Sequence, residues 1–508
     1  MAKTSKSGKA NRKLVSGGVT VVIVAVILIV VCFFTFISGV LPRTFTGVKI
    51  TETLPDGSTN TVKNFSVLET NFHFKEVFDT YSQYGMVSED TLDNVVNPET
   101  GETYRDALLR EAATQMRTLA LVERSAKESG FMPMSKAREV AAQNLQTLDF
   151  YATLYGFPSG QAYLKALYGT GTSKRAYTDF AARETLVQEY GSYVKQFDTS
   201  VVPTDAEVQA KHDENPNQYS VVDYSVYFCK AETDDEGKVI GMDKAVEAAK
   251  KITKAAKDTE SFRQAALDYV TDKKDEAAIT SFADGKDPCL TEGFTYTSAG
   301  YMDAKIKDYL FGDCKTGDTT VIETEFGAYA IYIAEKTNND YDTVTFRMLT
   351  LSAKTNKKDP TDEDKAAALN KTIEEAKTLC PSGIDPLSFY KLVKEHSTDL
   401  NSMLDGGYKS GLPATYFVST EEDPLDSAVV EAGKWLFDSS RKQGDTLVIA
   451  SQDGETVYVF YYEATRPAWD AVIRNEIITE NFSAWNGALE KNSPGYVINA
   501  GLVKYLVY

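Results

Sequence analysis

The chain has 508 residues, of which 25% are charged and 43% hydrophobic, and its formal net charge is −19. This length allows about three domains of ordinary size, and the composition is that of a folded protein. The acidic excess argues against nucleic-acid binding, because neutralising a phosphate backbone requires a surplus of Lys and Arg.

The chain opens with a basic tail, residues 1–18, followed by residues 19–41, which carry no charge. As a helix, this uncharged stretch would be about 35 Å long, enough to cross a hydrocarbon core of about 30 Å. We predict a single-pass, uncleaved signal-anchor in the cell membrane. The basic tail then lies in the cytoplasm and the rest of the chain is extracytoplasmic, because basic residues stay on the cytoplasmic side. A cleaved secretion signal is the alternative, although its apolar run is usually only about 7–15 residues long.

Residues 44–202 are predicted to be mainly helical. A hairpin is expected first, at residues 48–62, around a Pro-Asp-Gly turn. Apolar residues at a spacing of three to four then predict a helix that ends at Gly130, a second over residues 135–155 and a long one over residues 173–197.

The next stretch changes from a helical to a β pattern. Thr204 and Glu207 form a capping-box pattern, so a short helix is expected to start there. Pro216 limits its length, and the β-branched and aromatic residues 219–228 read as a strand.

Two segments resemble a known family. TDAEVQAKHDENPNQY from Thr204, and LALVERSAKESGFMPMSKAREV from Leu119, are similar to parts of the SurA/PrsA/PpiD foldases. In that family a helical chaperone domain precedes a parvulin-type prolyl isomerase domain. The resemblance implies an α+β fold, with a chaperone domain at 44–202 and a junction helix at 203–219. It also implies that residues 466–508 fold back onto the chaperone domain; a free C-terminal helical hairpin is the alternative.

The chain then repeats itself. GDTTVIETEFG from Gly317 and GDTLVIASQDG from Gly444 coincide at six positions with one fixed offset, through Gly327 and Gly454. The order of strands and helices around each motif resembles the parvulin fold, so two tandem parvulin-like domains are expected, at 220–338 and 343–465. The second has the clearer pattern, with Phe389 beginning a segment similar to the family's F-x-x-L-A-x-x-x-S-x-D…GG motif.

Both domains are expected to be degenerate. Parvulins resemble one another in placing two histidines beneath the proline, one on the first strand and one on the last. This sequence has three histidines, and His396 alone lies within a repeat. The other two are His73, in the helical part, and His212, in the junction helix. The expected histidine positions hold other residues: Val226, Met348, Tyr329 and, approximately, Thr456.

One residue remains as a candidate catalytic group. Asp399 stands near the family's Asp/Cys position, but an Asp after Ser-Thr is more often a turn or cap residue. No nucleophile elbow, zinc-protease motif or phosphate-binding loop is present, so we expect neither a cofactor nor a metal.

Five cysteines are present. Cys32 lies in the apolar stretch, and the others are Cys229, Cys289, Cys314 and Cys380. Their irregular spacing fits no zinc or redox motif. Buried free thiols are the preferred interpretation, and a Cys289–Cys314 disulfide stays open.

These observations predict a membrane-anchored extracytoplasmic chaperone whose partners are unfolded exported polypeptides. We expect these polypeptides to bind in a cleft between the helical domain and the two parvulin-like domains, which are inserted into it. Because both parvulin-like domains lack the histidine pair, we expect little or no isomerase activity. An active parvulin-type prolyl isomerase is the first alternative, and an envelope scaffold or docking protein is the second.

Overall fold

The computed structural model describes residues 40–131, 134–169, 171–283, 287–491, 493 and 495–503. The basic tail and the predicted anchor at 19–41, apart from its last two positions, lie outside these residues. Over the described residues, no helix combines the length and apolar character needed to cross a bilayer. The chain divides into two compact units: residues up to Asp198 and from Asn481 onward form the first, here called the helical unit, and Thr199–Glu480 form the second.

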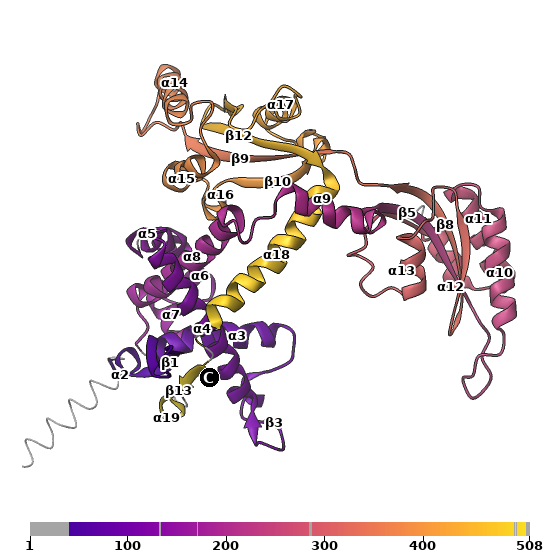
Figure 1. Cartoon of the computed structure of the whole chain (residues 1–508), viewed down its shortest axis with the longest axis horizontal. Coiled ribbons are helices and arrows are strands. Elements are labelled where there is room, and N and C mark those ends of the chain that lie inside the picture. Colours follow the sequence, from indigo (N-terminus) through magenta and orange to yellow (C-terminus); the bar gives the residue numbers. More distant parts are fainter. Residues whose placement is uncertain are drawn as a thin grey trace, which may run out of the picture. The chain divides into compact units, whose positions relative to one another are not determined.

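The helical unit consists mainly of helices, most of which are coloured indigo to purple in Figure 1. They are α2 (Val40–Thr44), α3 (Val67–Gln83), α4 (Tyr104–Glu128), α5 (Met134–Asn144), α6 (Leu148–Leu154), α7 (Gly160–Tyr168), α8 (Lys174–Phe197) and α19 (Ala500–Val503), with 3-10 turns at Glu89–Thr91 and Leu145–Thr147. The strands are β1 (Thr46–Thr53), β2 (Thr59–Ser66), β3 (Val95–Asn97), β4 (Glu102–Thr103) and β13 (Gly495–Ile498). α18 (Ala468–Glu490) begins in the second unit and ends in this one.

The predicted hairpin and long helices are confirmed, but the expected single helix over residues 135–155 is wrong. The 3-10 turn at Leu145–Thr147 separates α5 from α6. After this turn, Asp149 connects α6 to other helices, because its carboxylate accepts hydrogen bonds from the Gly160 N–H at 2.7 Å and from Lys174 Nζ at 2.8 Å. The apolar period alone did not reveal this change of direction.

The core of the helical unit lies where α3 and α4 cover the β1–β2 hairpin. Val48, Ile50 and Phe65 of the hairpin and Met116 of α4 are fully buried together. A capping box between Ser66 and Glu69 starts α3 directly after β2, because the two side chains satisfy each other's backbone donors.

The C-terminal segment belongs to this unit. β13 pairs antiparallel with β1, with Val48 opposite Ile498, and completes a sheet of order β13-β1-β2. At the end of α18, the carboxylate of Glu490 accepts hydrogen bonds from Arg117 and Thr118 of α4, both at 2.5 Å. The end of the chain therefore contributes to the fold of its beginning.

The second unit starts with α9 (Asp205–Glu214) and a 3-10 turn at Pro216–Tyr219. The predicted capping box between Thr204 and Glu207 is confirmed. Asp205, in the first turn, lies close to the guanidinium groups of Arg466, at 3.3 Å, and Arg474. These ion pairs hold the start of α9 against the first part of α18.

Two modules of mixed α/β structure follow. The first module (residues 220–338) contains β5 (Val221–Lys230), α10 (Met242–Ala255), α11 (Thr259–Lys273), α12 (Glu276–Ala283), β6 (Leu290–Phe294), α13 (Ala304–Leu310), β7 (Thr319–Thr324) and β8 (Gly327–Thr337). The second module (residues 343–465) is built on β9 (Asp342–Ser352), α14 (Asp362–Leu379), α15 (Pro386–His396), α16 (Leu400–Asp405), β10 (Tyr408–Pro413), α17 (Ser427–Leu436), β11 (Thr446–Ala450) and β12 (Thr456–Pro467), with a 3-10 turn at Ala414–Phe417. The mixed α+β class is confirmed.

The two modules share one sheet topology. Their four-stranded antiparallel sheets have the orders β6-β5-β8-β7 and β10-β9-β12-β11, which correspond strand by strand. The repeated Gly-Asp motifs also correspond. The N–H of Gly317 donates to the carbonyl of Ile333 at 2.8 Å, and that of Gly444 donates to the carbonyl of Tyr462 at 3.1 Å. In both modules the strand residue donates back to the Asp carbonyl of the motif.

The end of the motif is different. Gly327 is the first residue of β8, whereas Gly454 lies in a hairpin turn with φ +70°. Thr324 pairs with Gly327 around a two-residue turn, but Ser451 and Thr456 enclose the four residues 452–455. Gly327 and Gly454 therefore do not occupy equivalent positions in the structure, because the turn of the second hairpin is two residues longer.

Candidate functional sites

The expected histidine positions lie on one face of each parvulin-like sheet. Val226 of β5 is opposite Ile331, and Met348 of β9 is opposite Phe460. Both faces are covered by apolar and aromatic side chains, which in the first module include Tyr329. Since no histidine occurs in residues 220–338, an imidazole pair is absent from the first module.

The strand registers of the two sheets correct the assignment of Thr456 to an expected histidine position. Tyr329 is opposite Phe228, two residues before Ile331, and its counterpart two residues before Phe460 is Tyr458 rather than Thr456. The longer second hairpin causes this shift. Tyrosines thus occupy the last-strand position in both modules.

The three histidines belong to helices and not to these strands. His212 of α9 stacks on Trp469 of α18, with ring centroids 3.9 Å apart. His396 is the last residue of α15 and is 3.9 Å from the neighbouring carboxylate of Glu395. His73 is buried in α3 of the helical unit. The structure therefore brings no two imidazoles together.

Asp399, the predicted candidate catalytic residue, is the N-cap of α16. Its carboxylate accepts hydrogen bonds from the backbone N–H groups of Asn401 at 3.1 Å and Ser402 at 3.3 Å, and from the Ser402 hydroxyl. A capping role explains this geometry, because the first N–H groups of a helix have no partner within the helix.

The four cysteines of the described residues are buried free thiols, as preferred from the sequence. Burial raises the pKa of Cys229, Cys289 and Cys380 to about 12 in each case. Because the thiolate is the reactive form, these thiols are chemically inert near neutral pH.

The helical unit contains an apolar groove that sequence reasoning missed. It has a volume of about 670 Å³ and lies along α4 at the end of α3. We call it the α4 groove. The residues that line it include Tyr81, Met86, Val96, Tyr104, Leu108 and Tyr496. The signal in the sequence was weak, because these residues come from α3, the loop that follows it, β3, α4 and β13.

Large apolar side chains of the α4 groove are open to solvent. Met86 is 61% exposed and Val96 is 43% exposed, and the neighbouring Tyr84 is 74% exposed. Exposed apolar side chains gathered in a groove mark a binding site, and flexible Met side chains adapt to many partners. Arg110 and Glu111 add polar groups to the lining.

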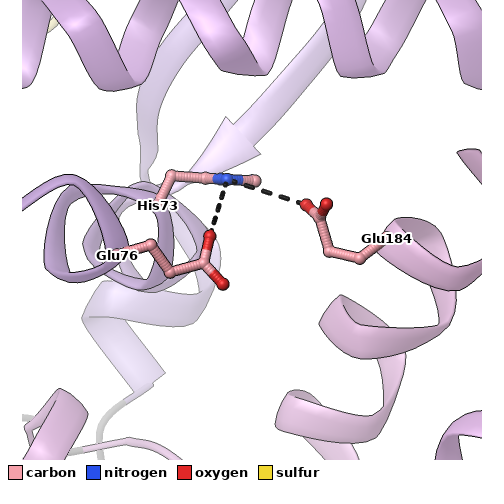
Figure 2. Close-up of side chains that lie close together, drawn as sticks. All are labelled: His73, Glu76 and Glu184. Atoms are coloured by element: carbon pink, nitrogen blue, oxygen red, sulfur yellow. Dashed lines mark ion pairs between the residues drawn. The ribbon is translucent and has the colours of Figure 1, made fainter. Parts of the chain in front are cut away.

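A second cluster in the helical unit combines three titratable side chains. His73 and Glu76 of α3 and Glu184 of α8 point toward one another in Figure 2. His73 Nδ1 lies 3.8 Å from Glu76 Oε2 and 3.8 Å from Glu184 Oε1. No sequence motif predicted this cluster, because α8 is distant from α3 along the chain.

Comparison with known proteins identifies the first module. Residues 231–337 match the family model described as PPIC-type PPIASE domain. The module is therefore a parvulin-type domain, as the sequence predicted for residues 220–338. The sequence pattern had favoured the second module, whereas this match falls on the first.

One similar solved structure is the crystal structure of peptidylprolyl isomerase (PrsA) from Bacillus anthracis. It is 16% identical, and the alignment covers 55% of this chain and 93% of that chain with a TM-score of 0.21. No curated protein matches the sequence.

Proposed function

We propose that this protein is a membrane-anchored extracytoplasmic chaperone that binds apolar segments of unfolded exported polypeptides. The α4 groove is the site of binding. The observation that carries the proposal is the exposure of Met86 and Val96 in a groove of about 670 Å³. A client segment that covers these side chains removes apolar surface from water, and this stabilises the complex by about 25 cal/mol per Å².

The parvulin-type domain supports membership of a foldase family. The residues at its expected catalytic positions support binding of client chains rather than catalysis of proline isomerisation. Isomerisation of an X-Pro bond must overcome a barrier of about 18–20 kcal/mol. Val226 and Tyr329 offer no imidazole for this task. In our proposal the two modules therefore contact client chains without isomerising their X-Pro bonds.

The uncharged stretch at residues 19–41 supports anchoring at the membrane, with the helical unit and both modules outside the cytoplasm. The net charge of −19 helps to keep a complex with an unfolded client soluble.

Aggregation of a denatured model protein, followed by light scattering, tests the proposal. The full chain in lipid nanodiscs should suppress aggregation, and the double variant Met86→Glu/Val96→Glu should lose most of this effect, because two carboxylates make the groove polar. Ile240→Glu is the matched control, since it changes an apolar residue that is 62% exposed and belongs to the first module, not to the helical unit. Equal suppression by both variants would reject the α4 groove as the binding site.

An active prolyl isomerase is a second candidate, which the family match at residues 231–337 favours. A protease-coupled assay on an X-Pro peptide tests it. Our account expects no acceleration by the wild-type chain. Acceleration that is lost in Asp399→Ala would favour the enzyme and the sequence-based assignment of this residue.

A further inference from the structure

The cluster of His73, Glu76 and Glu184 has the composition of a metal site. One nitrogen and two carboxylate oxygens, one from each residue, lie within 4.8 Å of one another. A tetrahedral ion with bonds of about 2.0–2.1 Å separates its ligand atoms by about 3.4 Å. The observed separations of 3.8 Å between the imidazole nitrogen and each carboxylate therefore need only a small contraction.

Accessibility also suits ion binding. The His73 side chain is only 4% exposed, whereas those of Glu76 and Glu184 are 47% and 40% exposed. An ion can therefore arrive through the carboxylates and meet a fixed imidazole behind them. His73 is held by aromatic rings, with Phe180 at 5.0 Å and Phe65 at 6.0 Å between centroids.

The nearby cationic side chains are engaged elsewhere. Arg183, beside Glu184, forms an ion pair with Glu69 and lies 3.8 Å from Glu123. Lys75 forms an ion pair with Asp79. Among the described residues, the charged contacts of Glu76 and Glu184 within 4 Å are those with His73.

We propose that His73, Glu76 and Glu184 bind a divalent first-row transition-metal ion, Zn²⁺ or Mn²⁺, with water completing the coordination. A neutral imidazole with two carboxylates suits these ions better than Ca²⁺ or Mg²⁺, which prefer oxygen ligands alone. Because two ligands come from α3 and one from α8, the ion joins the two helices. The metal therefore stabilises the core of the helical unit.

Calorimetric titration of the untagged full chain with ZnCl₂, MnCl₂ and CaCl₂ tests the site. We expect one Zn²⁺ or Mn²⁺ ion per chain, and binding at least about tenfold weaker in Glu76→Gln and in Glu184→Gln. His396→Gln is the matched control, because it removes another imidazole beside a carboxylate and should leave binding unchanged. Circular dichroism establishes that each variant is folded.

Two further readouts separate this site from other causes of binding. Co²⁺ should give visible absorption bands that Zn²⁺ abolishes and that Glu184→Gln lacks. Hydrogen exchange should slow in α3 and α8 when Zn²⁺ is added. Absence of saturable Zn²⁺ and Mn²⁺ binding, equal affinity for Ca²⁺, or unchanged affinity in both Gln variants would overturn the proposal.

Discussion

Glu463→Gln should strongly destabilise the second module, because it breaks a buried ion pair. Arg347 Nε donates to Glu463 Oε1 at 2.5 Å, and the two side chains are only 2% and 14% exposed. Removing one partner of such a pair costs about 3–5 kcal/mol, since the other charge stays buried. We expect the lower end, about 3 kcal/mol, because the Asp405 carboxylate also interacts with Arg347.

Hydrogen exchange measures this loss within one module of a larger chain. The loss of about 3 kcal/mol corresponds to a roughly hundredfold drop in protection for β9 and β12, with β5 and β8 unchanged. Replacing both partners, as in Arg347→Met/Glu463→Leu, should recover most of the protection, because an apolar pair of similar volume leaves no buried charge.

Glu455→Gln is the matched control, since it removes the carboxylate of an ion pair in the same module. Lys354 and Glu455 are 2.9 Å apart, but their side chains are 67% and 49% exposed. Such an exposed pair contributes little to stability, because water and salt screen both charges. If Glu463→Gln and Glu455→Gln reduce protection equally, the burial argument for the Arg347–Glu463 pair is refuted.

Two other predictions concern stability. Burial opposes ionisation of Glu123, but the Lys127 hydrogen bond and the charges of Lys63 and Arg183 outweigh it and lower the pKa of Glu123. This stabilisation is present above the unfolded value of about 4.5 and is lost as the pH falls. In urea unfolding, Glu123→Gln should therefore cost about 3 kcal/mol at pH 7 and progressively less below pH 4.5; a cost independent of pH would contradict the assignment. Gly317→Ala should cost about 1–2 kcal/mol, because φ is +89°. Gly444→Ala should cost more, since its added Cβ would also lie 3.2 Å from Gly383, and the reverse order would reject the crowding argument.

Local patterns predicted much of the fold. The capping box at Thr204 and Glu207 depends on neighbours three residues apart, so the start of α9 could be read directly. The repeated Gly-Asp motif likewise predicted two related domains, and the backbone hydrogen bonds of Gly317 and Gly444 correspond in the structure. Because the second hairpin is two residues longer, however, the sequence alignment assigned Thr456 to the last-strand position that Tyr458 occupies in the structure.

The candidate sites were harder to predict, because they are assembled from distant segments. The α4 groove includes Tyr496 from the end of the chain beside Tyr81 and Met86. The metal-like cluster joins His73 to Glu184 through the packing of α3 and α8. Only the spacing of His73 and Glu76, one helical turn apart, was visible in the sequence, and such a pair is ordinary on a helix surface.

Site-specific photocrosslinking tests the central claim most directly. A photoreactive amino acid at Met86 should crosslink a denatured client polypeptide, and one at Ile240 should crosslink it much less. Excess unlabelled client should compete with the reaction at Met86. Crosslinking that is equal at the two positions, or confined to Ile240, would contradict the account of the α4 groove as the place where this protein holds its clients.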